Sequence, residues 1–288
     1  MKKKFICLIL FACSLISSSC IHKTTHEDVV FKIKRVEKIE KRDEKHIYES
    51  LIMLDFPIQG PQPLLDSIRC FINQELNGDY SGNLADWQSM LNYYNEKYLN
   101  AMGVLLSVSP KQKAYLEKYN LSIMFAVNLR LESETEKVVN YYFYFDKMLV
   151  SGKVIKNPKV VTFRKSDGKI MKLNDLIVDI ESIEFLNIIN DALREYLSET
   201  REIYKIKKDS ELDEMITLKT IKNSIQHSSC YLGATELKIL YNALQEYHET
   251  PITDYFHEDG TIAAHIPLSI PYTKLKKVLT KDALELIE

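Results

Sequence analysis

Hydrophobic and polar residues alternate with a period of two over several stretches of the chain, which is typical of half-buried β-strands. The first stretch, residues 31–39, resumes at residues 47–58 after the polar residues 41–45, and it predicts a β-hairpin. A helix over residues 31–45 is the alternative, because the apolar residues there also suit one helical face. Further strands are predicted at residues 119–131, 138–150, 159–163, 169–173, 229–232, 236–241 and 261–270.

Other stretches carry apolar residues at helical spacing. A helix is predicted from Leu64 to Leu76, where Asn77 and Gly78 would end it. The remaining helices are predicted at residues 84–98, 183–197, 210–225 and 272–279. Because short hairpin turns outnumber βαβ crossovers, we expect an α+β fold with antiparallel sheets and packed helices.

The amino terminus has the pattern of a lipoprotein signal peptide. Three lysines at residues 2–4 precede an apolar run over residues 5–16, three serines and Cys20. The run is too short to cross a bilayer, which takes about 20 apolar residues. We therefore expect cleavage after residue 19 and a lipid on Cys20, which would anchor the chain, in the outer membrane by preference because Ile21 and not Asp follows. Ordinary cleavage near the serines, with Cys20 unmodified, is the alternative.

The length and the charge of the chain limit the number of domains and the kinds of partner that we expect. Residues 20–28 are polar and predict a tether, followed by two intertwined α+β subdomains over residues 29–160 and 161–288. Loss of the three leader lysines would lower the formal net charge from −2 to −5. This acidic excess argues against a nucleic-acid partner, which calls for a basic face.

Two cysteines follow Cys20 in the chain. Cys70 and Cys230 form an even pair in an oxidising compartment, so a disulfide between them is one prediction. Two separate buried thiols are the equal alternative.

Aromatic residues give the main positive signal for binding. The run from Tyr141 to Phe145 places aromatic side chains on both faces of a predicted strand, and Tyr142 and Tyr144 share one face. Tyrosine combines apolar area with a polar tip, so Tyr142 and Tyr144 are candidates for stacking on a ligand. The alternative is that one face lies in the core and a helix covers the other.

Two segments carry a family resemblance. Residues 169–177 (KIMKLNDLI) and 266–279 (IPLSIPYTKLKKVL) resemble the extracytoplasmic region of RsiV-type anti-sigma factors, which also precedes the catalytic domain of PdaC-type peptidoglycan deacetylases. The similarity extends over residues 30–286. It implies a sensor or binding region of the cell envelope, and RsiV-type proteins bind lysozyme. A Gly-Gly-Ala-His-Pro-like element of that family has no counterpart at residues 150–154 (VSGKV), so its role does not carry over.

Catalytic motifs are missing from the sequence. His227 starts a His-Ser-x-x-His-like element, but Tyr231 stands where a deacetylase has its second metal-binding histidine. His248, His257 and His265 lie among acidic residues at spacings that match no ligand pattern, so no metal or cofactor is predicted. Neither a Gly-x-Ser-x-Gly element nor a phosphate-binding glycine loop occurs.

These observations predict a non-catalytic lipoprotein of the cell envelope that binds a protein, lysozyme-like, or a peptidoglycan ligand. A peptidoglycan hydrolase or deacetylase with an unrecognised site is the first alternative. A structural subunit of an outer-membrane assembly is the second.

Overall fold

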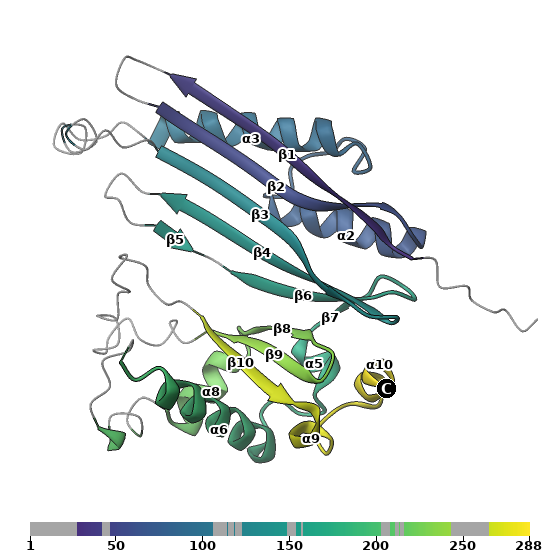
Figure 1. Ribbon diagram of the computed structural model, residues 1–288, viewed down its shortest axis with the longest axis vertical. Helices are drawn as coiled ribbons and strands as arrows, with labels where there is room; N and C mark the ends of the chain where they lie inside the picture. The colour runs from purple at the N-terminus through teal and green to yellow at the C-terminus, as the bar shows by residue number, and fades with distance from the viewer. Residues whose placement is uncertain are drawn as a thin grey trace, which may run out of the picture.

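The computed structural model describes residues 28–41, 47–105, 114, 118, 123–148, 154–156, 158–202, 208–210, 213, 216–242 and 265–288. Over these residues the fold is α+β, with a larger and a smaller sheet that are both mostly antiparallel (Figure 1). The larger sheet has strand order β1-β2-β3-β4-β6-β7, with β5 paired to β4, and the smaller sheet has order β10-β9-β8. The predicted fold class is confirmed.

The chain enters the larger sheet through the expected hairpin, and the helical alternative for residues 31–45 is wrong. Strand β1 (Val30–Lys41) pairs antiparallel with β2 (Ile47–Gln59), with Val36 opposite Ile52. Alternate residues of β2 are fully buried because they face the helices, and these are Ile52, Leu54 and Phe56.

Two helices cross one face of this sheet. Helix α2 (Gln62–Glu75) starts after Pro61, and α3 (Trp87–Leu105) follows it. The apolar stripe predicted for the first helix is confirmed, because Leu64, Leu65, Ile68, Phe71, Ile72 and Leu76 are all buried. Asn77 and Gly78, with φ of 108° and 78°, end α2 in the left-handed region that glycine adopts freely.

One strand pair departs from the antiparallel expectation. Strand β3 (Ile123–Glu134) runs parallel to β2, with Ile52 opposite Val127. The cause is the connection, because α2 and α3 carry the chain over the sheet and return it to the end where β2 began. Sequence periodicity identified these helices but not their role as a crossover.

The rest of the larger sheet is antiparallel. Strand β4 (Val138–Met148) lies between β3 and β6 (Lys159–Arg164), and β7 (Ile170–Met171) pairs with β6. Strand β5 (Val154–Lys156) pairs with the far end of β4. The core between this sheet and its helices includes Tyr94, Leu129, Tyr141 and Phe163, all fully buried.

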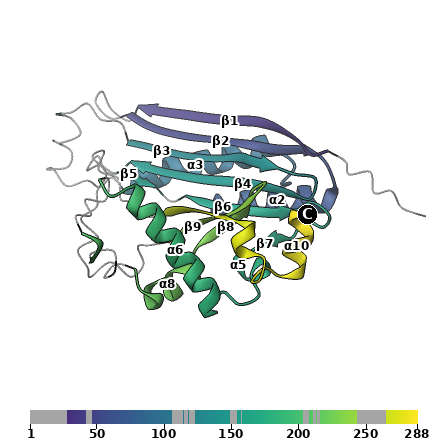
Figure 2. The ribbon, with the colours of Figure 1, turned by 60° about the horizontal axis from the view of Figure 1, so that its bottom comes forward.

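A second layer is built on the smaller sheet. Strands β8 (Ser229–Leu232), β9 (Glu236–Tyr241) and β10 (Ile266–Pro271) bury alternate residues against α6 (Ile183–Glu199) and α8 (Leu218–Ile225). The short helices α5 (Leu173–Leu176), α9 (Tyr272–Leu275) and α10 (Lys281–Ile287) complete this layer below the larger sheet (Figure 2).

Three details of these helices differ from the prediction. The last predicted helix is two helices, because Thr280 caps a new one by accepting a hydrogen bond from the Ala283 amide. Residues 216 and 217 precede α8 and are not helical. Ile183, expected on the apolar stripe of α6, is 61% exposed because it is the first residue after the Ser182 cap.

Buried hydrogen bonds join the two sheets where β8 meets β4 and β6. The Asn140 side chain donates to the Leu232 carbonyl at 2.6 Å and accepts from the Thr162 hydroxyl at 2.6 Å. The same hydroxyl accepts from the Leu232 amide at 3.1 Å. Both side chains are fully buried. The boundary placed between residues 160 and 161 therefore falls inside β6, a strand that both layers contact.

Candidate binding surface

Strand β4 divides its aromatic residues between two faces. Tyr141 and Phe143 are buried under the helices, and the Tyr141 hydroxyl donates to the Asp55 carbonyl at 2.8 Å. Burial raises the pKa of Tyr141 well above its usual value of 10, so the phenol stays a donor. Tyr142 and Tyr144, the predicted candidates, are half-buried on the opposite face.

The two candidate tyrosines pack against each other and against an arginine. Their rings are stacked, with centroids 6.3 Å apart and planes 24° apart. The guanidinium carbon of Arg130, directly opposite on β3, lies 5.1 Å from the centroid of Tyr142. A cation at this distance is attracted to the ring face. These contacts hold the two rings and the guanidinium in one arrangement.

This surface continues along β3 through a bulge. The β3–β4 register shifts between Leu131 and Ser133, so Glu132 is an extra residue in the ladder. Its carboxylate lies 3.4 Å from Arg130. It also accepts a hydrogen bond from the hydroxyl of Tyr231 on β8, which links the two sheets at the surface.

The smaller sheet extends the surface with a second polar row. Tyr231 lies opposite Lys238, which contacts Glu236 at 3.0 Å, and Glu236 accepts from Ser269. Partial burial raises the pKa of Tyr231, and the Glu132 hydrogen bond acts in the same direction. The hydrogen bond to Glu236 raises the pKa of Lys238, so this lysine stays a cation at neutral pH.

We call this set the tyrosine surface, made of Arg130, Glu132, Tyr142, Tyr144, Tyr231 and Lys238. It holds aromatic area, hydroxyl tips and charges of both signs on strands of two sheets joined by buried hydrogen bonds. Such a composition suits recognition of a polar macromolecule. Sequence reasoning found only its two β4 tyrosines. The alternation of residues along β3 could also have placed Arg130 on the same face as these tyrosines. The bulge at Glu132 has no recognisable sequence pattern.

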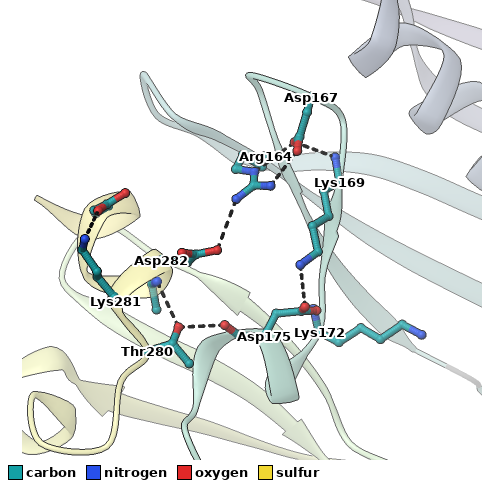
Figure 3. Close-up of polar contacts among 10 residues, drawn as sticks. Arg164, Asp167, Lys169, Lys172, Asp175, Thr280, Lys281 and Asp282 are labelled. Atoms are coloured by element: carbon teal, nitrogen blue, oxygen red, sulfur yellow. Dashed lines mark hydrogen bonds and ion pairs between the residues drawn. The ribbon is translucent and has the colours of Figure 1, made fainter.

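A separate polar cluster lies at the turn between β6 and β7 (Figure 3). Arg164 donates to the Asp167 carboxylate at 2.9 and 2.6 Å, and its guanidinium lies 3.6 Å from Asp282 of α10. Lys169 donates to Asp175 of α5 at 2.6 Å. A cavity of about 280 Å³ borders the cluster, lined by Lys137, Arg164, Ser166, Asp282, Glu285 and Leu286. Arg164 and Lys169 thus each have a carboxylate partner, so the cluster fastens the smaller layer to the larger sheet.

The other predicted site residues do not converge. Cys70 is exposed on α2 and Cys230 is buried on β8, and both are free thiols. Burial raises the pKa of Cys230 to about 12, which keeps it a thiol at neutral pH. Cys20 lies outside the described residues.

The histidines form no cluster in the described part of the chain. His227 is exposed beyond α8, and Tyr231 lies on a strand and not on the same helix. His265 is half-buried before β10, and burial lowers the pKa of its imidazole. His248 and His257 lie outside the described residues. Among the residues described, no three His, Cys, Asp or Glu side chains gather as metal ligands.

None of the described helices combines the length and the apolar character that a membrane span requires. The predicted leader at residues 2–20 lies outside the residues that the structure describes.

Comparisons with known proteins give the fold and nothing finer. No protein-family model matches the chain, and no curated protein matches its sequence. A crystal structure of a DUF3298 family member from Bacteroides fragilis superposes with a TM-score of 0.65 at 15% identity, covering 91% of this chain and 98% of that one. A DUF3298 family protein from Pseudomonas aeruginosa superposes with a TM-score of 0.55 at 11% identity, covering 90% and 97%. The chain therefore shares the fold of these proteins, whose domain has no known function.

Proposed function

We propose that this protein is a non-catalytic lipoprotein of the cell envelope that binds a macromolecular ligand through the tyrosine surface. The ligand is a lysozyme-like protein or peptidoglycan, as the resemblance to the RsiV-type extracytoplasmic region implies. The lipid on Cys20 would hold the binding layers close to the membrane, in the outer membrane by preference.

The observation that carries this proposal is the arrangement of Arg130, Tyr142 and Tyr144. Tyrosine and arginine supply much of the energy of protein interfaces, because they bring large area together with directional polar groups. Here the guanidinium and the two rings already contact one another, so little side-chain freedom is lost when a ligand binds. No described helix lies over them, since α2 and α3 cover the other face (Figure 1).

The chemistry of Cys230 supports binding without catalysis. A nucleophilic cysteine needs a lowered pKa. Burial moves the pKa of Cys230 the other way, to about 12, so this thiol is unreactive near neutral pH. Tyr231 stands where a deacetylase has a metal-binding histidine, and its hydroxyl donates a hydrogen bond to Glu132. We therefore assign Tyr231 a binding role, as part of the tyrosine surface.

A binding assay on the full chain tests the proposal. The lipoprotein, solubilised in detergent, is incubated with lysozyme and separately with purified peptidoglycan, and the retained fraction is measured. We expect retention on at least one ligand, and loss of about tenfold in affinity or more in Tyr142→Ser, which corresponds to about 1.4 kcal/mol. Tyr93→Ser is the matched control, because Tyr93 is 40% exposed on α3.

Two results would overturn the proposal. One is binding of neither ligand by the folded chain. The other is release of acetate or muropeptides from peptidoglycan at a measurable turnover. The anchor is tested separately by labelling cells with a palmitate analogue, which should tag the native chain and leave Cys20→Ala untagged.

A further inference from the structure

Strand β1 is a long open edge of the larger sheet. No described strand pairs with its second side, and it has 12 residues where the opposite edge strand β7 has 2 (Figure 1). An edge strand offers unpaired backbone N–H and C=O groups to which a further strand can add. Its isoleucines Ile33 and Ile39 are 72% and 58% exposed.

The open face of β1 carries a pattern that complements itself. Ile33, Arg35, Glu37 and Ile39 follow one another on this face, while Val36 between them lies opposite the buried Ile52. Read in the reverse direction, the pattern places isoleucine against isoleucine and arginine against glutamate. We propose that two copies of the chain pair antiparallel through β1, about a two-fold axis at Val36.

The geometry of antiparallel sheets restricts the register. Residues directly opposite each other lie on the same face of the sheet. With a two-fold axis perpendicular to the sheet, the second strand can therefore slide along the first only in steps of two residues, and each step moves the axis by one residue. One shift moves the axis to Arg35, which would then face its own copy. The other moves it to Glu37, with the same result. Like charges directly opposite are destabilising, so the axis at Val36 is favoured.

In that register, each outward residue gains a suitable partner. Ile33 lies opposite Ile39 of the second copy, which removes two exposed apolar side chains from water at each end. Arg35 lies opposite Glu37 of the second copy. Because Arg35 and Glu37 already contact at 2.6 Å within one copy, pairing would form a network of four alternating charges.

The face under the helices is also compatible with this pairing. Lys34 and Lys38 would lie opposite each other, but each is engaged within its own copy. The Lys34 ammonium is 4.3 Å from the ring centroid of Trp87, and that of Lys38 is 3.4 Å from the Glu96 carboxylate. Both partners belong to α3, so the helix offsets the positive charge along this edge.

Pairing through β1 has a consequence for binding. An axis perpendicular to the sheet leaves the open faces of both copies on the same side. Two tyrosine surfaces would then face one direction on a continuous sheet and could bind a repeating ligand at two points, with a gain in avidity. The pairing itself depends only on β1 and does not require the proposed function.

Charge exchange tests the pairing. The mass of the full chain in detergent is measured by sedimentation equilibrium for the wild type, Arg35→Glu, Glu37→Arg and an equimolar mixture of the two variants. We expect a dimer for the wild type and monomers for each variant alone, where like charges meet across the axis. The mixture should restore the dimer, because each introduced charge then faces an opposite charge on the other variant. Lys281→Glu, a charge reversal on α10, is the control and should dimerise. Circular dichroism shows whether each variant is folded.

Disulfide trapping tests the register in isolated envelopes. In a Cys70→Ser background, Ile33→Cys/Ile39→Cys places thiols on directly opposite residues whose Cα atoms are about 4.5–5.5 Å apart, within the Cα separation that a disulfide spans. Copper phenanthroline with oxygen then oxidises the paired thiols. A dimer band is expected for the double variant and is not expected for either single variant, where the thiol meets isoleucine.

Three outcomes would overturn the proposal. They are a monomeric wild type, a mixture of charge variants that stays monomeric although both are folded, and cross-linking of the single cysteine variants as strong as that of the double variant.

Discussion

The buried hydrogen bonds among Asn140, Thr162 and Leu232, here called the polar joint, offer the sharpest test of how the two sheets are held together. Asn140→Ala removes the donor to the Leu232 carbonyl and the acceptor of the Thr162 hydroxyl, both at 2.6 Å in a fully buried place. Each buried group left without its partner costs about 1–3 kcal/mol. The two groups together predict a loss of about 2–6 kcal/mol in the free energy of unfolding.

Urea unfolding, followed by circular dichroism and by the fluorescence of the single tryptophan, Trp87, measures this loss. Asn128→Ala is the matched control, because Asn128 is half-buried on the neighbouring strand β3. This substitution should lower the free energy of unfolding by only about 0.5 kcal/mol. Thr162→Val should be much less harmful in the Asn140→Ala background than alone, since the two side chains share one hydrogen bond. If Asn140→Ala costs no more than Asn128→Ala, the assigned role of the joint is refuted.

Three further predictions concern other parts of the molecule. In the folded chain a thiol reagent should label Cys70 quickly and Cys230 only on unfolding, as mass spectrometry of the peptides would reveal; equal labelling of both contradicts the burial of Cys230. The hydrogen bonds from Arg164 lower the pKa of Asp167 below 3.8, so this carboxylate stabilises the fold above that pH and loses the contribution as the pH falls through the lowered pKa. Asp167→Asn should therefore flatten the acid limb of stability against pH, and a profile identical to that of the wild type would rule the effect out. Tyr141→Phe should lower the free energy of unfolding by about 1 kcal/mol through loss of the bond to the Asp55 carbonyl, and an unchanged denaturation midpoint would count against it.

Local patterns in the sequence predicted the elements better than their arrangement. The stripe of α2 and the alternation of β4 follow from burial of one face, which is written into residue spacing. The parallel pairing of β2 with β3 depends on where a two-helix crossover returns the chain, and spacing does not encode this.

The candidate site was predictable in the same partial way. Tyr142 and Tyr144 share a face because strand residues two apart always do. Glu132 reaches Tyr231 through a bulge and a contact between sheets, so this half of the surface depends on tertiary packing. The separation of Cys70 and Cys230 likewise follows from the positions of α2 and β8 in different layers.

The claim that the tyrosine surface binds the ligand is tested most directly by hydrogen exchange on the full chain, with and without saturating lysozyme or soluble peptidoglycan fragments. The account predicts slower exchange in β3, β4 and β8 around Arg130, Tyr142 and Tyr231, with α2 and α3 unchanged. Protection confined to the helical face, or no protection anywhere under conditions where the ligand is bound, would contradict it.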